Sequence, residues 1–167
     1  MAVYSTVIGG QLRRLKRMKD NICSEDVMDF LEQAHSAVQL NGVSNLNGPC
    51  KRTLMHYAAM GDCRELLLQL LAFRTPIDVR DGHHRTPLSW AAQYGSYVTA
   101  RILVENGANV NALDKAFMTP LSRLLQEGKS GTKNYAALKV YLEKNGATTK
   151  GRKRAWIRER LRLQHYY

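Results

Sequence analysis

Threonine recurs at a fixed interval along this chain of 167 residues, each time two positions before an apolar residue. Thr53, Thr86 and Thr119 are 33 residues apart, and the pair Ala58-Ala59 returns at the same interval as Ala91-Ala92. A module of this length is too short to bury its own apolar face, so several copies must stack against one another. The interval therefore predicts a solenoid with an extended open surface, which suits binding better than chemistry.

Each copy has the pattern of a short helix, a tight turn, a second helix and a polar stretch. In the second copy these parts are Thr86–Ala92, the turn Tyr94-Gly95, and Ala100–Gly107. Threonine at the helix start can accept a bond from an unpaired amide, and the proline after it needs no donor there. Glycine at a helix end supplies a positive φ angle. The sequence thus assigns these residues structural tasks.

The third copy departs from the interval after its first helix. Its second helix is predicted over 135–145, because Gly146-Ala147 follows Gly107-Ala108 by 39 residues, so about six extra residues occupy a loop at 129–134. Gly128-Lys129-Ser130 begins next to this loop, but neither Arg123 nor Leu124 is the earlier glycine that a phosphate-binding loop requires. We interpret residues 129–134 as an inserted loop.

The second copy closely resembles the ankyrin repeat, almost position for position. The resemblance covers roughly residues 48–147 and rests on Thr86-Pro87-Leu88, Ala91-Ala92, Gly95, Leu103, Gly107-Ala108-Asn109-Val110-Asn111-Ala112 and Asp114. Leu54 stands where the family has proline, and Leu124-Leu125 replaces its alanine pair. The resemblance implies an all-α solenoid of about three helix-turn-helix repeats with short hairpin loops, at 48–80, 81–113 and 114–147.

Helical caps are predicted at both ends of the stack. Ser24 is a plausible N-cap for a helix over 24–39, which a loop to residue 47 follows. At the other end, within 148–167, a helix over 152–164 places Trp156, Ile157 and Leu161 along one side. Repeat stacks need such end pieces, with an apolar inner face and a polar outer face.

The resemblance also implies a binding surface on the concave side, made of hairpin tips and the exposed side of each first helix. Mapped onto this chain, four of its twelve positions are basic and one is acidic, so we expect a partner with an acidic or mixed surface. The positions are Arg52, Met60, Arg80, His83, Arg85, Gln93, Tyr94, Leu113, Lys115, Met118, Gln126 and Glu127. The alternative for any one of them is a solvated tip.

Three further side chains are predicted to be structural. Tyr57 and Trp90 occupy matching positions in the first helices, where packing against the next repeat is favoured over partner contact. His56 is expected to bond to nearby backbone or hydroxyl groups. The pair His83-His84 is predicted at a hairpin tip, without the second ligand pair that a zinc site needs.

The net charge of +11 lies entirely in the two ends of the chain, because 13 basic and 13 acidic residues balance between positions 20 and 149. Either segment 1–23 or the final helix could bind an acidic partner or carry a nuclear signal. Segment 1–23 could also lie on an anionic membrane or serve as a mitochondrial presequence. The basic residues are Arg13, Arg14, Lys16, Arg17, Lys19, Arg152, Lys153, Arg154, Arg158, Arg160 and Arg162.

The three cysteines lack framework spacing, which favours reduced thiols and a cytoplasmic or nuclear location. No apolar run is long enough to span a bilayer. We expect a monomer that needs no metal or cofactor and is not an enzyme, because the repeat pattern gives nearly every candidate acid or base a structural task.

Two functions remain open at this stage. The favoured one is a protein-protein interaction module that binds through its concave surface. The alternative is a basic nucleic-acid or chromatin accessory protein in which the stack is a scaffold and the charged ends bind. The sequence names neither the partner nor the pathway. It also leaves open that the chain comes from a longer repeat protein or is a secreted effector that enters a host cell.

Overall fold

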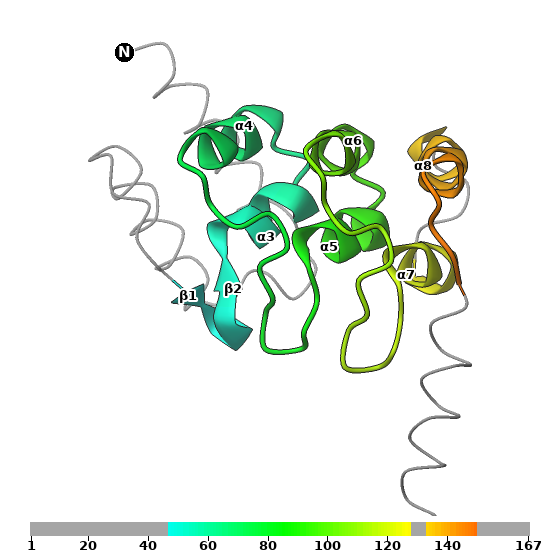
Figure 1. Ribbon diagram of the computed structural model, residues 1–167, viewed down its shortest axis with the longest axis horizontal. Helices are drawn as coiled ribbons and strands as arrows, with labels where there is room; N and C mark the ends of the chain where they lie inside the picture. Colours follow the sequence, from blue (N-terminus) through cyan, green and yellow to red (C-terminus); the bar gives the residue numbers. More distant parts are fainter. Residues whose placement is uncertain (1–46, 128–132, 150–167) are drawn as a thin grey trace, which may run out of the picture.

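The computed structural model describes residues 47–127 and 133–149, and these form two rows of helices (Figure 1). The inner row consists of α3 (Leu54–Met60), α5 (Pro87–Tyr94) and α7 (Pro120–Glu127). The outer row consists of α4 (Arg64–Ala72), α6 (Tyr97–Glu105) and α8 (Lys133–Lys144). Because α5 packs against both α3 and α7, the pairs lie in register side by side. This arrangement confirms the predicted ankyrin-type stack.

Hairpin loops extend from one side of the stack, beneath the inner helices in Figure 1. The first contains β1 (Asn47–Gly48), the 3-10 turn η1 (Pro49–Lys51) and β2 (Arg52–Thr53), with Asn47 opposite Thr53. Backbone bonds join successive loops: the Gly82 amide donates to the Cys50 carbonyl at 2.6 Å and the Lys115 amide to the His83 carbonyl at 3.0 Å. A Cβ at Gly82 would lie 2.8 Å from that Cys50 oxygen, so this approach requires glycine.

The core between the repeats combines small residues on the inner helices with leucines on the outer ones. Ala58, Ala59, Ala91 and Ala92 are fully buried, which allows the inner helices to approach closely. The leucines fill the space between the rows, and each contributes on the order of 2 kcal/mol by its burial. They include Leu66, Leu67, Leu70, Leu103, Leu138 and Leu142.

The helix ends follow the capping rules that the sequence predicted. The Thr86 hydroxyl accepts from the Ser89 amide at 3.3 Å, and the Thr119 hydroxyl accepts from the Ser122 amide at 3.2 Å. Gly107 follows α6 with a φ of 88°. In the first repeat Arg74 takes the matching position with a φ of 55°, although a side chain disfavours that conformation.

Two helix boundaries differ from the sequence-based expectation. Helix α6 begins at Tyr97, three residues before the predicted start at Ala100, and α8 begins at Lys133, two residues before the predicted start at Tyr135. In both cases the first turn carries polar or half-buried side chains. Such residues give no apolar periodicity, so the sequence pattern detects only the buried part of each helix.

The predicted segments at 1–23, 24–47 and 148–167 lie almost wholly outside the described residues. Residues 128–132 of the inserted loop also lie outside them. At the last described repeat, Leu125 is 43% exposed, whereas Ala59 and Ala92 at the matching positions are fully buried. Val140 on α8 is 63% exposed. The end of the stack therefore presents apolar surface that the predicted C-terminal helix could cover.

If the C-terminal segment covers this surface, replacing Trp156, Ile157 and Leu161 together by serine should lower the thermal unfolding midpoint by several degrees, because each buried apolar side chain contributes about 1.5–3 kcal/mol. Differential scanning calorimetry measures this shift. The matched control replaces Arg152, Arg154 and Arg158 by serine and should leave the midpoint unchanged. Equal midpoints for both variants would contradict the capping role.

His56 connects the start of α3 to the next hairpin. The Thr53 amide donates to His56 Nδ1 at 3.0 Å, so Nε2 carries the proton and donates to the Arg85 carbonyl at 3.1 Å. The ring is completely buried, and this burial lowers the pKa of His56 below 6.5, although the Arg85 carbonyl and the Asp81 charge act in the opposite direction. The expected local bonding of this histidine is confirmed.

Because His56 is neutral in the fold and its pKa is lowered, protonation below about pH 6.5 favours the unfolded chain. The free energy of unfolding should fall as the pH drops from 7 to 5, by at most about 1.4 kcal/mol per pH unit for this group. Urea titrations at several pH values measure the slope. His56→Gln should flatten it, while the exposed-site control His83→Gln should not; an unchanged slope in His56→Gln would refute the assignment.

Candidate functional site

Two buried aspartates organise the hairpin loops that border the inner helices. Asp81 Oδ1 accepts from the amides of His83 and Arg85 at 2.8 and 2.9 Å. Asp114 Oδ1 accepts in the same way from the amides of Ala116 and Met118 at 2.8 and 3.0 Å. Each carboxylate thus fixes the backbone on both sides of a hairpin tip, so the tips are held rigidly on the helical scaffold.

The second oxygen of each aspartate binds a side chain from the inner helix that follows. Trp90 Nε1 donates to Asp81 Oδ2 at 3.0 Å. In the next repeat Arg123 donates to Asp114 Oδ2 from Nε at 2.7 Å and from Nη2 at 2.5 Å. Trp90 and Arg123 are 33 residues apart, so two unlike side chains perform the same task.

An arginine from the preceding hairpin approaches each aspartate as well. The distance from Arg52 Nε to Asp81 Oδ2 is 3.9 Å, and that from Arg85 Nε to Asp114 Oδ2 is 3.8 Å. The guanidinium carbons of Arg52 and Arg85 each lie 4.5 Å from the centre of the Trp90 ring, within cation-π range. Arg85 also donates to Gln93 Oε1 at 2.7 Å. These contacts link the loops of adjacent repeats.

The charge that reaches solvent at the loop tips is positive. The side chains of Asp81 and Asp114 are 0% and 2% exposed, and they are the only acidic residues in the three tips at 47–53, 80–86 and 113–119. Lys51, Arg80 and Lys115 are exposed there. We call this row of three tips, with its cations, the tip edge.

The outer helices carry charges of both signs. On α4 the Arg64 guanidinium is 3.5 Å from the Glu65 carboxylate. On α6 Arg101 lies 3.5 Å from Glu105, and on α8 Lys139 lies 4.0 Å from Glu143. Exposed pairs of this kind contribute less than about 1 kcal/mol to stability. Helices α4 and α6 have no net charge, and α8 has a net charge of +2, from three lysines and Glu143. The outer face therefore exposes carboxylates such as Glu105 and Glu143 beside its cations, whereas the three tips expose cations alone.

The structure brings most of the predicted binding positions to one side but gives them different exposure. Met60 and Met118 are only 2% and 5% exposed, so they serve packing. The side chain of Glu127 lies outside the described residues. Four positions are exposed and five are half-buried: Arg80, His83, Lys115 and Gln126, then Arg52, Arg85, Gln93, Tyr94 and Leu113. The basic residues predicted in the two chain ends fall outside the described ranges.

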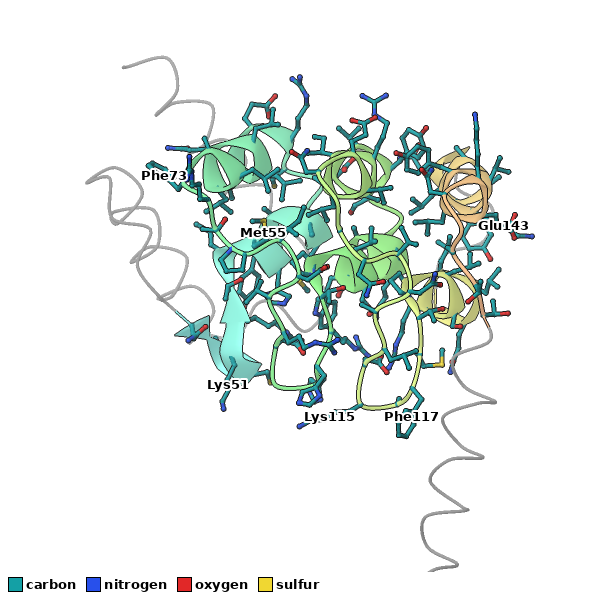
Figure 2. All side chains as sticks on the ribbon, viewed as in Figure 1. Lys51, Met55, Phe73, Lys115, Phe117 and Glu143 are labelled. Atoms are coloured by element: carbon teal, nitrogen blue, oxygen red, sulfur yellow. The ribbon has the colours of Figure 1, made fainter. Side chains whose placement is uncertain are left out.

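The predicted packing of the aromatic residues is confirmed, since Tyr57 is 0% and Trp90 5% exposed. Lys51 and Phe117 also lie at the tip edge (Figure 2), although neither is among the twelve predicted binding positions. With His84 they share the 33-residue interval, which is the signal that could have identified them. His83 and His84 lie at a hairpin tip, as expected.

Beside Tyr94 lies a shallow depression of about 190 Å³, bordered by the ends of α3 and α5 and by Asn134 of α8. It is smaller than the pockets that usually hold small molecules, which measure about 300–1,000 Å³. Within 47–127 and 133–149, no three side chains of the metal-binding types lie close enough together to hold an ion. In the same ranges, no helix is long and apolar enough to cross a membrane.

The aspartate network predicts unequal costs for two equivalent substitutions. Asp114→Ala leaves the buried guanidinium of Arg123 without its carboxylate and should cost about 3–5 kcal/mol of unfolding free energy. Asp81→Ala removes the same loop bonds but leaves a neutral indole N–H, so it should cost about 1–3 kcal/mol. Urea unfolding measures both values.

The double variant Asp114→Ala with Arg123→Leu should recover part of the larger loss, because it removes the unpaired cation. Costs that are equal for the two aspartates, or a double variant no more stable than Asp114→Ala, would argue against the paired charge as the source of the difference.

Comparison with known proteins agrees with this architecture. Residues 22–114, more than half of the chain, match the family model described as ankyrin repeats in three copies. The matched range begins before strand β1 and ends before helix α7. In the structure the stack continues past the matched range with α7 and α8.

Three curated relatives are much longer proteins. Protein glp-1 of Caenorhabditis elegans is 37% identical over 68 residues, which are 41% of this chain and 5% of that protein. The potassium channel KOR1 of Oryza sativa is 37% identical over 84 residues, 44% of this chain and 10% of the channel. The ADP-ribosylation factor GTPase-activating protein AGD4 of Arabidopsis thaliana is 27% identical over 138 residues, 75% of this chain and 18% of that protein.

The chain thus spans less than a fifth of each of these relatives, and the likeness concerns a repeat region alone. The 33-residue interval, the stacked helix pairs and the matching family model all lead to one assignment. The chain belongs to the ankyrin repeat family.

Proposed function

We propose that this chain is a non-enzymatic interaction module that binds another protein along its concave side, between the tip edge and the exposed flank of the inner helices. The observation that carries the proposal is the asymmetry of charge: the carboxylates of the tips are buried in the scaffold while Lys51, Arg80 and Lys115 face solvent. A surface of this kind favours an acidic or mixed partner.

Preorganisation supports the same proposal. The two aspartates hold the second and third tips through backbone amides, and loop-to-loop bonds keep the three tips in register. A rigid surface loses little conformational entropy when it binds, so its contacts are available for affinity. Tyr94, which is half-buried at the end of α5 and lies 6.1 Å from Trp90 between ring centres, supplies an aromatic contact on the inner helix.

We place this activity in the cytoplasm or nucleus. Cys50 and Cys63 are both free thiols in the structure, one exposed and one buried. Unpaired cysteines are typical of reducing compartments. Imaging of a fluorescent fusion in living cells measures the distribution, and accumulation in a secretory or mitochondrial compartment would contradict this placement.

The concave surface is tested with the combined variant Arg80→Ala, Tyr94→Ala and Lys115→Ala. Proteins captured from a cell lysate by the wild type should be lost with this variant, and a purified partner should bind at least tenfold more weakly by titration calorimetry, since interface anchors contribute 1–2 kcal/mol or more each. The control Arg64→Ala, Arg101→Ala and Lys139→Ala removes three cations from the outer helices and should retain the partner.

The nucleic-acid alternative predicts a different outcome. Neutralising the basic residues at 11–19 and 150–162 would abolish binding, and affinity would fall steeply with added salt. Capture that survives neutralised ends but fails with the concave variant supports our proposal. Capture that is unaffected by the concave variant would refute it.

A further inference from the structure

Three residues at the tip edge adopt a backbone conformation that disfavours side chains. Lys51, His84 and Phe117 have φ angles of 57°, 58° and 55°. They are spaced 33 residues apart, so they occupy the same place in three successive tips. Glycine adopts this left-handed conformation without steric cost, whereas other residues enter it at a cost. A non-glycine residue at all three tips therefore calls for an explanation.

In two of the three tips, those of His84 and Phe117, the scaffold imposes this conformation whatever the side chain. In the second and third tips the aspartate accepts from the amides on either side of the strained residue, from His83 and Arg85 around His84 and from Ala116 and Met118 around Phe117. The amides of His84 and Phe117 also donate to the carbonyls of Asp81 and Asp114, each at 2.9 Å. The turn geometry is thus set by the aspartate, and the side chain at the tip adds nothing to it.

The side chains of Lys51 and Phe117 project from the tip edge, away from the helices (Figure 2). Lys51 and His84 are exposed and Phe117 is half-buried. Figure 2 shows Lys51 and Phe117 at opposite ends of the row of loops, with Lys115 between them. The row consequently runs from a cation at the first tip, past an imidazole and further cations, to an aromatic ring at the third. Backbone strain that persists in such an exposed place is typical of functional sites.

We infer that Lys51, His84 and Phe117 are the specificity-determining residues of the tip edge, and that their partner is an extended peptide segment with acidic residues and one apolar side chain. This rests on the proposed function and names its partner class. The acidic residues of the peptide face Lys51, Arg80 and Lys115. The aspartates of the tips, Asp81 and Asp114, are buried, and the apolar side chain of the peptide packs on Phe117.

The size of the segment follows from the stacking. Packed helices lie about 8–10 Å apart, so three tips span roughly 16–20 Å. An extended chain advances about 3.3 Å per residue, so about six residues cover the row. A single-stranded nucleic acid would also use the cations and could stack a base on Phe117, so an oligonucleotide is included in the test as the competing ligand.

The experiment measures fluorescence anisotropy of labelled ten-residue peptides added to the full chain. One peptide carries four glutamates and a leucine, the second replaces the leucine by serine, and a single-stranded oligonucleotide of ten nucleotides is the third probe. The wild type should bind the leucine peptide about tenfold more tightly than the serine peptide. Phe117→Gly should abolish that preference and leave the serine peptide unaffected, whereas Lys51→Gly should weaken both peptides.

Folding provides the second readout. Because glycine is favoured at a positive φ, Lys51→Gly, His84→Gly and Phe117→Gly should each unfold at a temperature no lower than the wild type. Lys139→Ala on the outer helix α8 is the matched control and should bind both peptides as the wild type does.

Several results would overturn the inference: no binding of either acidic peptide, a leucine preference that survives Phe117→Gly, tighter binding of the oligonucleotide than of the leucine peptide, or glycine variants that unfold at lower temperature. Capture of a folded partner in the lysate experiment would still support the proposed function in these cases. The two tests therefore fail separately.

Discussion

The close approach of α3, α5 and α7 is the constraint on which the rest of the structure depends. Helices of seven or eight residues are unstable alone in water, so each must draw its stability from its neighbours. The fully buried alanine pairs Ala58-Ala59 and Ala91-Ala92 allow that approach, and the leucines of the outer row seal the layer behind it. The spacing of the inner helices then sets the spacing of the loops, and hence the length of any surface built from the tips.

The aspartate network converts this spacing into a charged edge. The carboxylate at the base of the second and third tips is fully used by two amides, one helix side chain and one arginine of the preceding loop, as Asp114 shows with Ala116, Met118, Arg123 and Arg85. The negative charge is buried by the contacts that build the loop, whereas lysines and arginines farther out remain in solvent. The scaffold and the proposed binding surface therefore depend on the same interaction, and a mutation of Asp81 or Asp114 will disturb both.

The sequence predicted the helix pairs well because their signals repeat. Threonine caps, buried alanines and Gly107 recur at one interval, and local physics explains each. The prediction of the binding positions was less reliable, because a repeat position tells where the backbone lies but not what covers the side chain. Met60 lies at the end of α3, where the Ser96 hydroxyl donates to its carbonyl, and its side chain is buried. The sequence pattern did not predict that Trp90 and Arg123 have equivalent roles, because the two side chains have only an N–H donor and their length in common.

The end of the charge network explains why the third repeat departs from the pattern. Arg52 and Arg85 each precede a capping threonine and approach an aspartate in the next tip, and the residue matching them in the third repeat is Met118. Counted from Gly146-Ala147, the position that corresponds to Asp114 is Lys153. The sequence therefore places no aspartate at the position that would pair with an arginine at 118, and a buried guanidinium without a carboxylate costs several kcal/mol. The buried, uncharged Met118 avoids that cost, so the paired charges stop at the third tip, where Phe117 supplies an aromatic ring instead.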